Sequence, residues 1–139
     1  MRYLRLFYWI RSDVLQDIAL ELTADVIYKV PIFQDCELQF MHHLVNLLIP
    51  RLYSPGDIIV NVGDIGKEMY FVVRGEVEVI GDGGRVVATL KSMNYFGEIA
   101  MFFAARRTAT VRARTFCDLF VLTRCGESAE KNRSAITLT

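Results

Sequence analysis

Apolar residues recur at three- and four-residue steps in the first third of the chain, a spacing that places side chains on one face of an α-helix. The first such stretch begins at Ser12 or Asp13, either of which can cap a helix, and Pro31 interrupts it. The second begins after Asp35, another possible cap, and ends at Pro50. The pattern therefore predicts two helices, with apolar faces formed by Val14, Leu15, Ile18, Leu22, Val26 and Ile27 in the first and by Leu38, Met41, Leu44, Val45 and Leu48 in the second.

Between residues 51 and 124 the apolar period falls to two, and turn residues recur about every eight to twelve positions. Val77 and Val79 alternate with Glu76 and Glu78, as in a strand that is buried on one face. The glycine-rich run 81–84 predicts a hairpin loop. Many short strands separated by glycine turns are typical of a sandwich, barrel or jelly roll. The expected strands are Ile58–Val60, Met69–Val73, Val77–Ile80, Val86–Leu90, Thr108–Ala113 and Leu119–Leu122.

Composition and charge argue against several classes of protein. Hydrophobic residues make up 53% of the 139 residues, so a folded domain with a core is expected. The formal net charge is zero, which argues against binding to nucleic acid or to anionic lipid. No apolar run approaches the roughly 20 residues that span a bilayer, so no membrane span is expected. The apolar run Tyr3–Ile10 is short and contains Arg5, which favours a buried or amphipathic helix over a signal peptide or membrane anchor.

The cysteines and histidines do not form a recognisable metal or catalytic set. Cys36, Cys117 and Cys125 include no CxxC pair, which argues against a zinc site or a disulfide framework and favours a reducing, intracellular setting. His42 and His43 are adjacent on a predicted helix, so they point in different directions and cannot share a metal ion in the usual way. No Ser/His/Asp or Cys/His arrangement is convincing either. We therefore expect neither a metal site nor an enzyme.

The segment Phe96–Val111 breaks the strand rhythm. Gly97 is followed by six helix-compatible residues, then by Arg106 and Arg107, and then by a β-rich run, which predicts a short helix between two strands. A helix N-terminus, a glycine that lets an anion approach the backbone, and the planar donor fork of an arginine together suit a phosphate group. Thr108 adds a hydroxyl donor. The segment therefore indicates a phosphate site.

Glu98 is the unexpected member of this segment, because a carboxylate next to a phosphate site would repel the ligand. A ribose 2′-hydroxyl explains its presence, since a carboxylate is a strong acceptor for that group. The residues thus indicate a pocket for a phosphorylated ribose. An Arg-Arg pair is more commonly a solvated surface, however, and a glycine in a β protein is more commonly a turn. On the residues alone, an exposed loop remains the more common alternative.

The same segment and two of the turns resemble a known family. Phe96–Ala100 and Arg106–Val111 are similar, in sequence and in spacing, to the two halves of the phosphate-binding cassette of cyclic-nucleotide-binding domains. Ser54–Asp57 and Gly63–Tyr70 resemble the glycine turns of that fold. A lone Phe-Gly-Glu would be a weak signal, whereas this ordered set is highly specific. The resemblance covers roughly residues 13–124.

Two upstream segments resemble the ion channels of this family in particular. Val30–Cys36 is similar to the start of the domain in nucleotide-gated channels, and Asp13–Lys29 to the end of the linker between pore and sensor. The resemblance implies an α+β fold, with N-terminal helices followed by an eight-stranded antiparallel β-roll (a double-stranded β-helix or jelly roll) that contains a short internal helix. We expect a linker-like helical segment at 1–29, the cyclic-nucleotide-binding domain at 30–124, and a polar, disordered tail at 125–139.

The resemblance also implies a role for each residue of the cassette. In that family the arginine at Arg107 binds the phosphate oxygens, the glutamate at Glu98 accepts the ribose 2′-hydroxyl, and Thr108 contacts phosphate or a guanine edge. Arg106 is expected to face solvent. The ligand is cAMP or cGMP, with no metal or other cofactor. Backbone amides near Gly97, Ile99 and Ala100 cradle the sugar and phosphate, and the candidates for purine contacts are Val79, Ala88 and Leu90.

The implied function is a regulatory module of a nucleotide-gated cation channel, at the cytoplasmic face of the plasma membrane. Its partners are the cyclic nucleotide and, through the N-terminal linker helix, the pore domain or other channel subunits; no nucleic acid is expected. Two alternatives stay open: a soluble regulator of the kinase regulatory subunit type, and a degenerate assembly domain that binds no nucleotide. After Arg124 the family continues into an amphipathic lid helix. Gly126 and the lack of an apolar stripe after it predict no such helix here, so we expect the chain to be a fragment.

Overall fold

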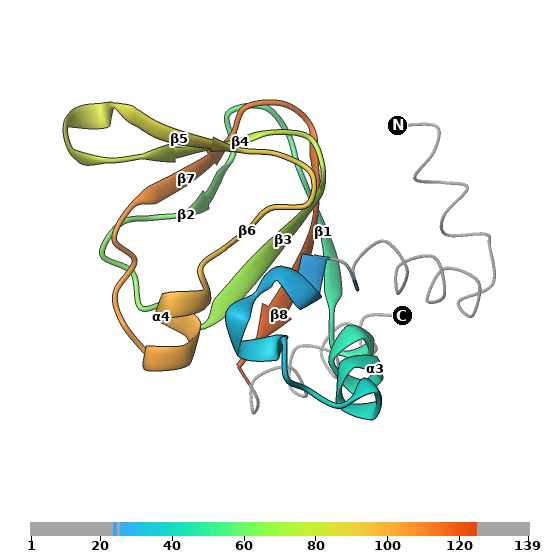
Figure 1. The fold of residues 1–139 in the computed structure, drawn as a ribbon. Helices are drawn as coiled ribbons and strands as arrows, with labels where there is room; N and C mark the ends of the chain where they lie inside the picture. Colours follow the sequence, from blue (N-terminus) through green and yellow to red (C-terminus); the bar gives the residue numbers. More distant parts are fainter. Residues whose placement is uncertain (1–23, 25, 125–139) are drawn as a thin grey trace, which may run out of the picture. The chain divides into compact units, whose positions relative to one another are not determined.

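The computed structural model describes residue 24 and residues 26–124. The chain divides between Leu47 and Leu48 into two compact units, a helical one and a β-rich one, and each is described by itself (Figure 1). The predicted helix from Ser12 or Asp13 and the predicted tail at 125–139 lie outside the described residues, apart from the helical residues 24 and 26–29. None of the described helices is long and apolar enough to cross a membrane.

The helical unit contains a short 3-10 helix, η1 (Pro31–Phe33), and the helix α3 (Leu38–Asn46). The predicted cap Asp35 is wrong. Glu37 precedes α3 with an extended backbone and no side-chain cap hydrogen bond, and a capping residue must lie directly before the first turn. The apolar period nevertheless identifies the buried face of the helix, which consists of Met41, Leu44 and Val45.

The end of α3 also differs from the prediction, because the chain leaves the helix before Pro50. The helix ends at Asn46, so Leu48 lies outside it, and Pro50 lies within the strand β1 (Ile49–Tyr53). A proline cannot donate a backbone hydrogen bond, and it is tolerated here because β1 is at the edge of its sheet. Pro50 is therefore part of a strand and not a helix terminator.

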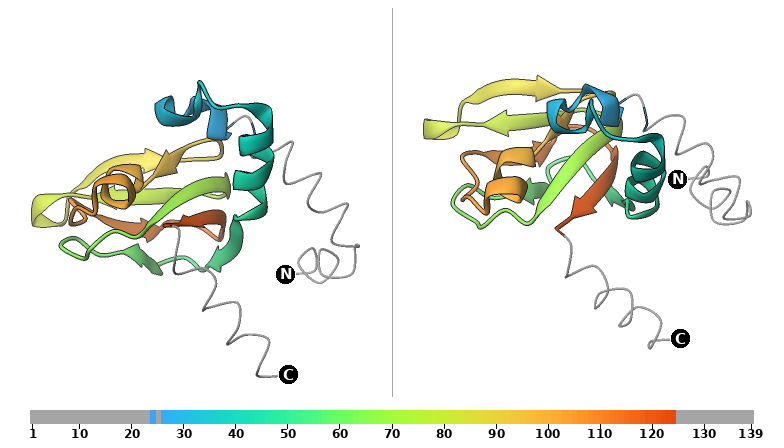
Figure 2. Two further views of the ribbon diagram at one scale, coloured as in Figure 1. Left: turned by 90° about the horizontal axis from the view of Figure 1, so that it is seen from below. Right: turned by 60° about the horizontal axis from the view of Figure 1, so that its bottom comes forward.

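The β unit consists of two four-stranded antiparallel sheets (Figures 1 and 2). The strand order is β1-β8-β3-β6 in the first sheet and β2-β7-β4-β5 in the second. A short helix, α4 (Glu98–Phe103), connects β6 to β7. The predicted α+β fold, with an eight-stranded antiparallel roll and an internal helix, is confirmed. The remaining strands are β2 (Ile58–Val60), β3 (Glu68–Arg74), β4 (Val77–Ile80), β5 (Val86–Leu90), β6 (Tyr95–Phe96), β7 (Thr110–Ala113) and β8 (Cys117–Thr123).

Five strands differ from the sequence pattern, and one of them, β3, extends one residue beyond the predicted strand at each end. The pattern does not predict β6, which has only two residues and so cannot show an alternation, or β1, which Pro50 interrupts. β7 begins at Thr110 and not at Thr108, because the backbone just before it is hydrogen-bonded to the β2–β3 loop. β8 begins at Cys117, two positions before the predicted start. The differences therefore fall at strand ends and in the shortest strand.

The β4–β5 hairpin agrees with the prediction. Val77 pairs with Leu90 and Val79 with Ala88, and the glycine-rich loop between the strands forms the short helix η2 (Asp82–Gly84). In both views of Figure 2 the hairpin extends beyond the other strands of its sheet. The predicted hairpin is thus a projecting edge of the second sheet.

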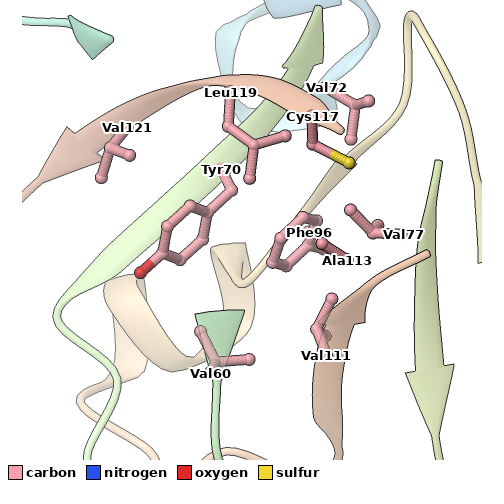
Figure 3. Packing of buried hydrophobic residues seen from close by; sticks show 10 residues of the cluster. All are labelled: Val60, Tyr70, Val72, Val77, Phe96, Val111, Ala113, Cys117, Leu119 and Val121. Carbon is pink, nitrogen blue, oxygen red and sulfur yellow. The ribbon is translucent and has the colours of Figure 1, made fainter. Parts of the chain in front are cut away.

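The core of the β unit lies between its two sheets, where side chains from both point toward one another (Figure 3). Each large apolar side chain that is fully buried there contributes roughly 1.5–3 kcal/mol to stability. Phe96 belongs to this cluster and directly precedes Gly97, so the core fixes the point at which α4 begins. The buried members are Val60, Tyr70, Val72, Val77, Phe96, Val111, Ala113, Cys117, Leu119 and Val121.

Candidate functional site

Backbone hydrogen bonds join the β2–β3 loop to the segment that follows α4. They run from Gly63 N to Arg107 O (2.8 Å), from Arg107 N to Asp64 O (2.7 Å) and from Gly66 N to Ala105 O (3.1 Å). The predicted glycine turn and the predicted arginine pair are far apart in the sequence. The structure nevertheless places them side by side. We call this contact between residues 63–66 and residues 105–107 the junction.

The guanidinium of Arg107 is held at this junction by backbone carbonyls. Its Nη1 donates to Gly97 O (3.1 Å) and its Nη2 to Glu68 O (2.6 Å). Its Cζ lies 5.9 Å from the ring centre of Tyr70, which is within cation–π range. Arg107 is only 8% exposed, and within residues 24 and 26–124 it is the one buried charged residue. No carboxylate in that part of the chain forms an ion pair with it.

The Arg107 guanidinium occupies space that is open only because residues 66 and 97 are glycines. Gly97 precedes α4 with a left-handed backbone (φ +86°), and a Cβ on it would lie 2.6 Å from Nη1 of Arg107. A Cβ on Gly66 would lie 2.1 Å from Cβ of Ala100 and 3.0 Å from Cζ of Arg107. These separations are far below van der Waals contact. A side chain at either position would therefore displace the guanidinium or α4.

Glu98 begins α4 with a half-buried carboxylate. It directly follows Gly97, whose carbonyl accepts a hydrogen bond from Arg107. Among the described residues, none donates a hydrogen bond to this carboxylate or pairs with it. Within the described part of the chain, the junction therefore combines the buried cation of Arg107, which has no countercharge, and the carboxylate of Glu98, which has no hydrogen-bond donor.

The other predicted ligand residues differ in exposure. Ala100 is buried, whereas Ile99 is 62% exposed and Thr108 is also exposed. Arg106 is exposed, as expected, and its Nη1 donates to Gly63 O (2.8 Å). The first turn of any helix leaves backbone N–H groups without intrahelical acceptors, and in α4 this turn includes the amides of the predicted cradle.

The candidates for purine contacts lie on the β4–β5 hairpin. Val79 and Ala88 are directly opposite each other in the two strands. Val79 and Leu90 are half-buried and pack against the core cluster, which also contains Tyr70 and Phe96, whereas Ala88 is exposed. These candidates therefore belong to the second sheet, while the carbonyl of Glu68 that supports the guanidinium belongs to the first.

Residues 50–125, more than half of the chain, match the family described as the cyclic nucleotide-binding domain. The chain belongs to this family. A cyclic nucleotide-gated channel of Caenorhabditis elegans is 43% identical over 120 residues, which cover 81% of this chain and 16% of that protein. The human cyclic nucleotide-gated channel alpha-3 is 41% identical over 115 residues, or 78% of this chain and 17% of that protein. The chain thus spans only 16–17% of the length of these channels.

Solved structures of cyclic nucleotide-binding domains have the same fold. The regulatory domain of Toxoplasma gondii PKA with cAMP is similar with a TM-score of 0.70 and 26% identity, over 76% of this chain and 41% of that one. PKAR CBD2 with bound Sp-2Cl-cAMPS is similar with a TM-score of 0.64 and 26% identity, over 78% of this chain and 74% of that one. The jelly-roll fold inferred from the sequence is therefore that of known cAMP-binding domains.

In this cyclic nucleotide-binding domain, the sequence did not point to Glu68 and Tyr70, which contact the Arg107 guanidinium, or to Arg51, which contacts Glu68. The carboxylate of Glu68 accepts two hydrogen bonds from Arg51 (3.2 and 2.9 Å) and one from the hydroxyl of Tyr70 (2.6 Å). The ring of Tyr70 stacks on Phe96, with centroids 4.9 Å apart. Burial, then the hydrogen bond to Glu68, raises the pKa of the Tyr70 phenol far above its ordinary value, so the hydroxyl remains a donor. The sequence feature that could have identified them is the alternation of side chains in β3, which places Glu68 and Tyr70 on the same face of the strand.

The described residues of this cyclic nucleotide-binding domain contain no cluster of His, Cys, Asp and Glu that could hold a metal ion. Cys117 is a buried free thiol, and Cys36 is half-buried. His42 and His43 are both exposed on α3.

Proposed function

We propose that the β unit binds a cyclic nucleotide, cAMP or cGMP, with the phosphate on Arg107 and the ribose 2′-hydroxyl on Glu98. The state of Arg107 carries this proposal, because two neutral carbonyls and, among the described residues, no carboxylate hold its buried charge. A buried charge without a countercharge is costly. An anionic ligand group supplies that countercharge, and a guanidinium has further N–H donors with which to bind it.

The start of α4 and the residue after Arg107 complete the contacts to sugar and phosphate. The backbone amides near Gly97, Ile99 and Ala100 lie in the first turn, where N–H groups lack intrahelical acceptors. The exposed hydroxyl of Thr108 is available to a phosphate oxygen or to a guanine edge. This arrangement supplies neutral donors around the one buried cation.

The purine rests on apolar side chains of the β4–β5 hairpin, namely Val79, Ala88 and Leu90. The exposure of Ala88 and the half-burial of the other two support this assignment, because a base needs apolar surface that a ligand can reach. No metal and no other cofactor is part of the proposed site, and no catalytic step is assigned to it.

For the whole protein, we propose a ligand sensor of a cyclic nucleotide-gated cation channel at the cytoplasmic face of the plasma membrane. Residues 1–29 would link it to the pore domain or to other subunits. Identity of 41–43% to channels over most of the chain supports this, against 26% to the PKA structures. A soluble regulator is the second candidate, supported by the TM-score of 0.70 to the PKA regulatory domain.

Fluorescence anisotropy of labelled cAMP and cGMP, titrated with the 139-residue chain, tests the proposed binding. Arg107→Gln should weaken binding about ten- to several-hundred-fold, because each hydrogen bond to a charged group contributes about 1.5–3 kcal/mol. Glu98→Gln should weaken it somewhat less. Arg106→Gln is the matched control, since this neighbouring arginine is exposed, and it should keep the parent affinity.

Two results would contradict the proposal in different ways. If Arg107→Gln binds as tightly as the parent, the phosphate is not on Arg107. If the parent binds neither nucleotide, the alternative of a degenerate assembly domain replaces a binding function.

A further inference from the structure

Close to Arg107, a carboxylate on β3 connects this strand to β1, which lies on the other side of β8 in the first sheet. Glu68 accepts hydrogen bonds from Nη1 (3.2 Å) and Nη2 (2.9 Å) of Arg51 on β1, and from the hydroxyl of Tyr70 (2.6 Å) on β3. The side chains of Arg51 and Glu68 are 31% and 18% exposed, so the pair is partly shielded from water. Three donors from two strands therefore fix the position of one carboxylate.

The same two residues of β3 support the guanidinium of Arg107. The backbone carbonyl of Glu68 accepts a hydrogen bond of 2.6 Å from Nη2, and the ring of Tyr70 lies 5.9 Å from Cζ. The Tyr70 ring is held in turn by stacking on Phe96 at an interplanar angle of 11°. Contacts that hold Glu68 and Tyr70 in place therefore also hold the carbonyl and the aromatic ring that the Arg107 guanidinium contacts.

We propose that Arg51, Glu68 and Tyr70 are positioning residues that hold the Arg107 guanidinium in its binding orientation before a ligand arrives. This inference rests on the proposed function, in which Arg107 binds the phosphate. An arginine side chain has many rotamers, and fixing one of them in the free protein lowers the entropy lost on binding. None of the three side chains needs to touch the ligand.

A second ion pair of the β unit provides a matched control. Arg112 Nη2 donates to Glu78 Oε2 (2.8 Å), with side chains 41% and 17% exposed, which is close to the exposure of the Arg51–Glu68 pair. This pair joins β4 and β7 of the second sheet, whereas the Arg107 guanidinium donates to the carbonyls of Gly97 and Glu68. Loss of Glu78 therefore removes a comparable ion pair without touching the supports of Arg107.

Nucleotide affinity of the 139-residue chain gives the first test. Glu68→Gln, Tyr70→Phe and Arg51→Gln should each weaken cAMP or cGMP binding about three- to thirty-fold, and Glu78→Gln should change it by less than about twofold. In an Arg107→Gln background the three effects should disappear, because residues that act through Arg107 are not additive with its loss. Effects that persist in that background would overturn the positioning role.

NMR of the arginine side-chain N–H groups in the ligand-free protein gives a second test that needs no nucleotide. The Arg107 guanidinium signals should be protected from solvent exchange in the parent and in Glu78→Gln, and should lose protection in Tyr70→Phe and Arg51→Gln. Unchanged protection in both variants would overturn the inference. If the parent binds no nucleotide but protection is lost as expected, the positioning role holds and the proposed function fails.

Tyr70→Phe keeps the ring, its stacking on Phe96 and its place under Arg107, and removes only the hydroxyl. If Glu68→Gln is too unstable to fold, the measurements on Tyr70→Phe are therefore the ones that test the positioning role.

Discussion

At the scale of single residues, the site depends on space as much as on charge. Arg107 reaches the carbonyls of Gly97 and Glu68 only because neither Gly97 nor Gly66 carries a side chain. The charge itself has no acidic partner within the described residues. Substitutions that fill this space should therefore affect binding as much as loss of the charge does.

Gly66→Ala should weaken nucleotide binding roughly tenfold, or about 1.4 kcal/mol, because its Cβ would lie 2.1 Å from Cβ of Ala100 and must displace α4. Titration with fluorescent cAMP measures the change. Gly83→Ala is the control: Gly83 lies in the exposed hairpin loop and has no atom within 4 Å of an added Cβ, although, unlike Gly66, it has a positive φ (+72°). That variant should lose some stability through its backbone but keep its affinity. Equal affinities for Gly66→Ala and the parent would contradict the close-packing argument.

Cys117 should be protected from alkylation in the folded protein. It is 2% exposed, and its Sγ lies 3.2 Å from the carbonyl oxygens of Glu76 and Thr115. Burial raises the pKa of this thiol, so its contribution to stability is complete below the ordinary thiol pKa and is lost as the pH rises through the raised value. Peptide mass mapping after iodoacetamide treatment at mildly alkaline pH should find Cys117 modified only in urea. Equal modification of Cys117 and half-buried Cys36 in the folded protein would contradict this.

At the scale of elements, β8 organises the first sheet because it lies between β1 and β3. Its residues alternate toward the core, and Leu119 and Val121 are fully buried. In β3, Glu68 shares a face with Tyr70 and Val72, which belong to the core cluster. The stability of β8 and the geometry of the site are therefore linked through β3.

Leu119→Ala should lower the free energy of unfolding by about 2–5 kcal/mol, because it leaves a cavity between the sheets. Urea denaturation followed by circular dichroism measures the loss. Leu52→Ala on the edge strand β1 is the control, since Leu52 is 52% exposed and should change stability by less than about 1 kcal/mol. Similar losses for the two variants would show that β8 is not central to the fold.

The elements also show where sequence reasoning succeeds. The period of apolar residues gives the buried face of α3 and most strands, because burial on one face is a local pattern. The apolar period does not identify β6 or the residue before α3, because one or two residues are too few to show a period. The cassette from Gly97 to Arg107 is recognisable because its spacing is local in sequence. The Arg51–Glu68 pair is not, because it depends on β1 and β3 lying on the two sides of β8, and strand order cannot be read from a period.

At the scale of the whole molecule, ligand binding and folding are coupled. The proposed ligand contacts come from α4, from the segment after it and from the β4–β5 hairpin, which the unfolded chain does not hold together. A ligand that binds only the folded state stabilises it by mass action. Stability is therefore a direct measure of the proposed function.

Saturating cAMP or cGMP, at about 100 times its dissociation constant, should raise the free energy of unfolding by about 2.7 kcal/mol and the melting temperature by several degrees. Differential scanning fluorimetry measures the shift. Adenosine, which lacks the phosphate, should give a much smaller one, and Arg107→Gln should lose most of the shift with either cyclic nucleotide. No shift of the parent with both nucleotides would favour the degenerate assembly domain.

The strand order has a consequence for how the protein is made. β8 completes the sheet that begins with β1, and β7 lies between β2 and β4 in the other. While the ribosome is still synthesising the chain, β2 must wait without a partner for β7 and β1 must wait for β8, the last strand, whereas the β4–β5 hairpin can close at once. Such unpaired strand edges attract other chains. Newly synthesised molecules should therefore depend on chaperones for the interval between the first strand and the last.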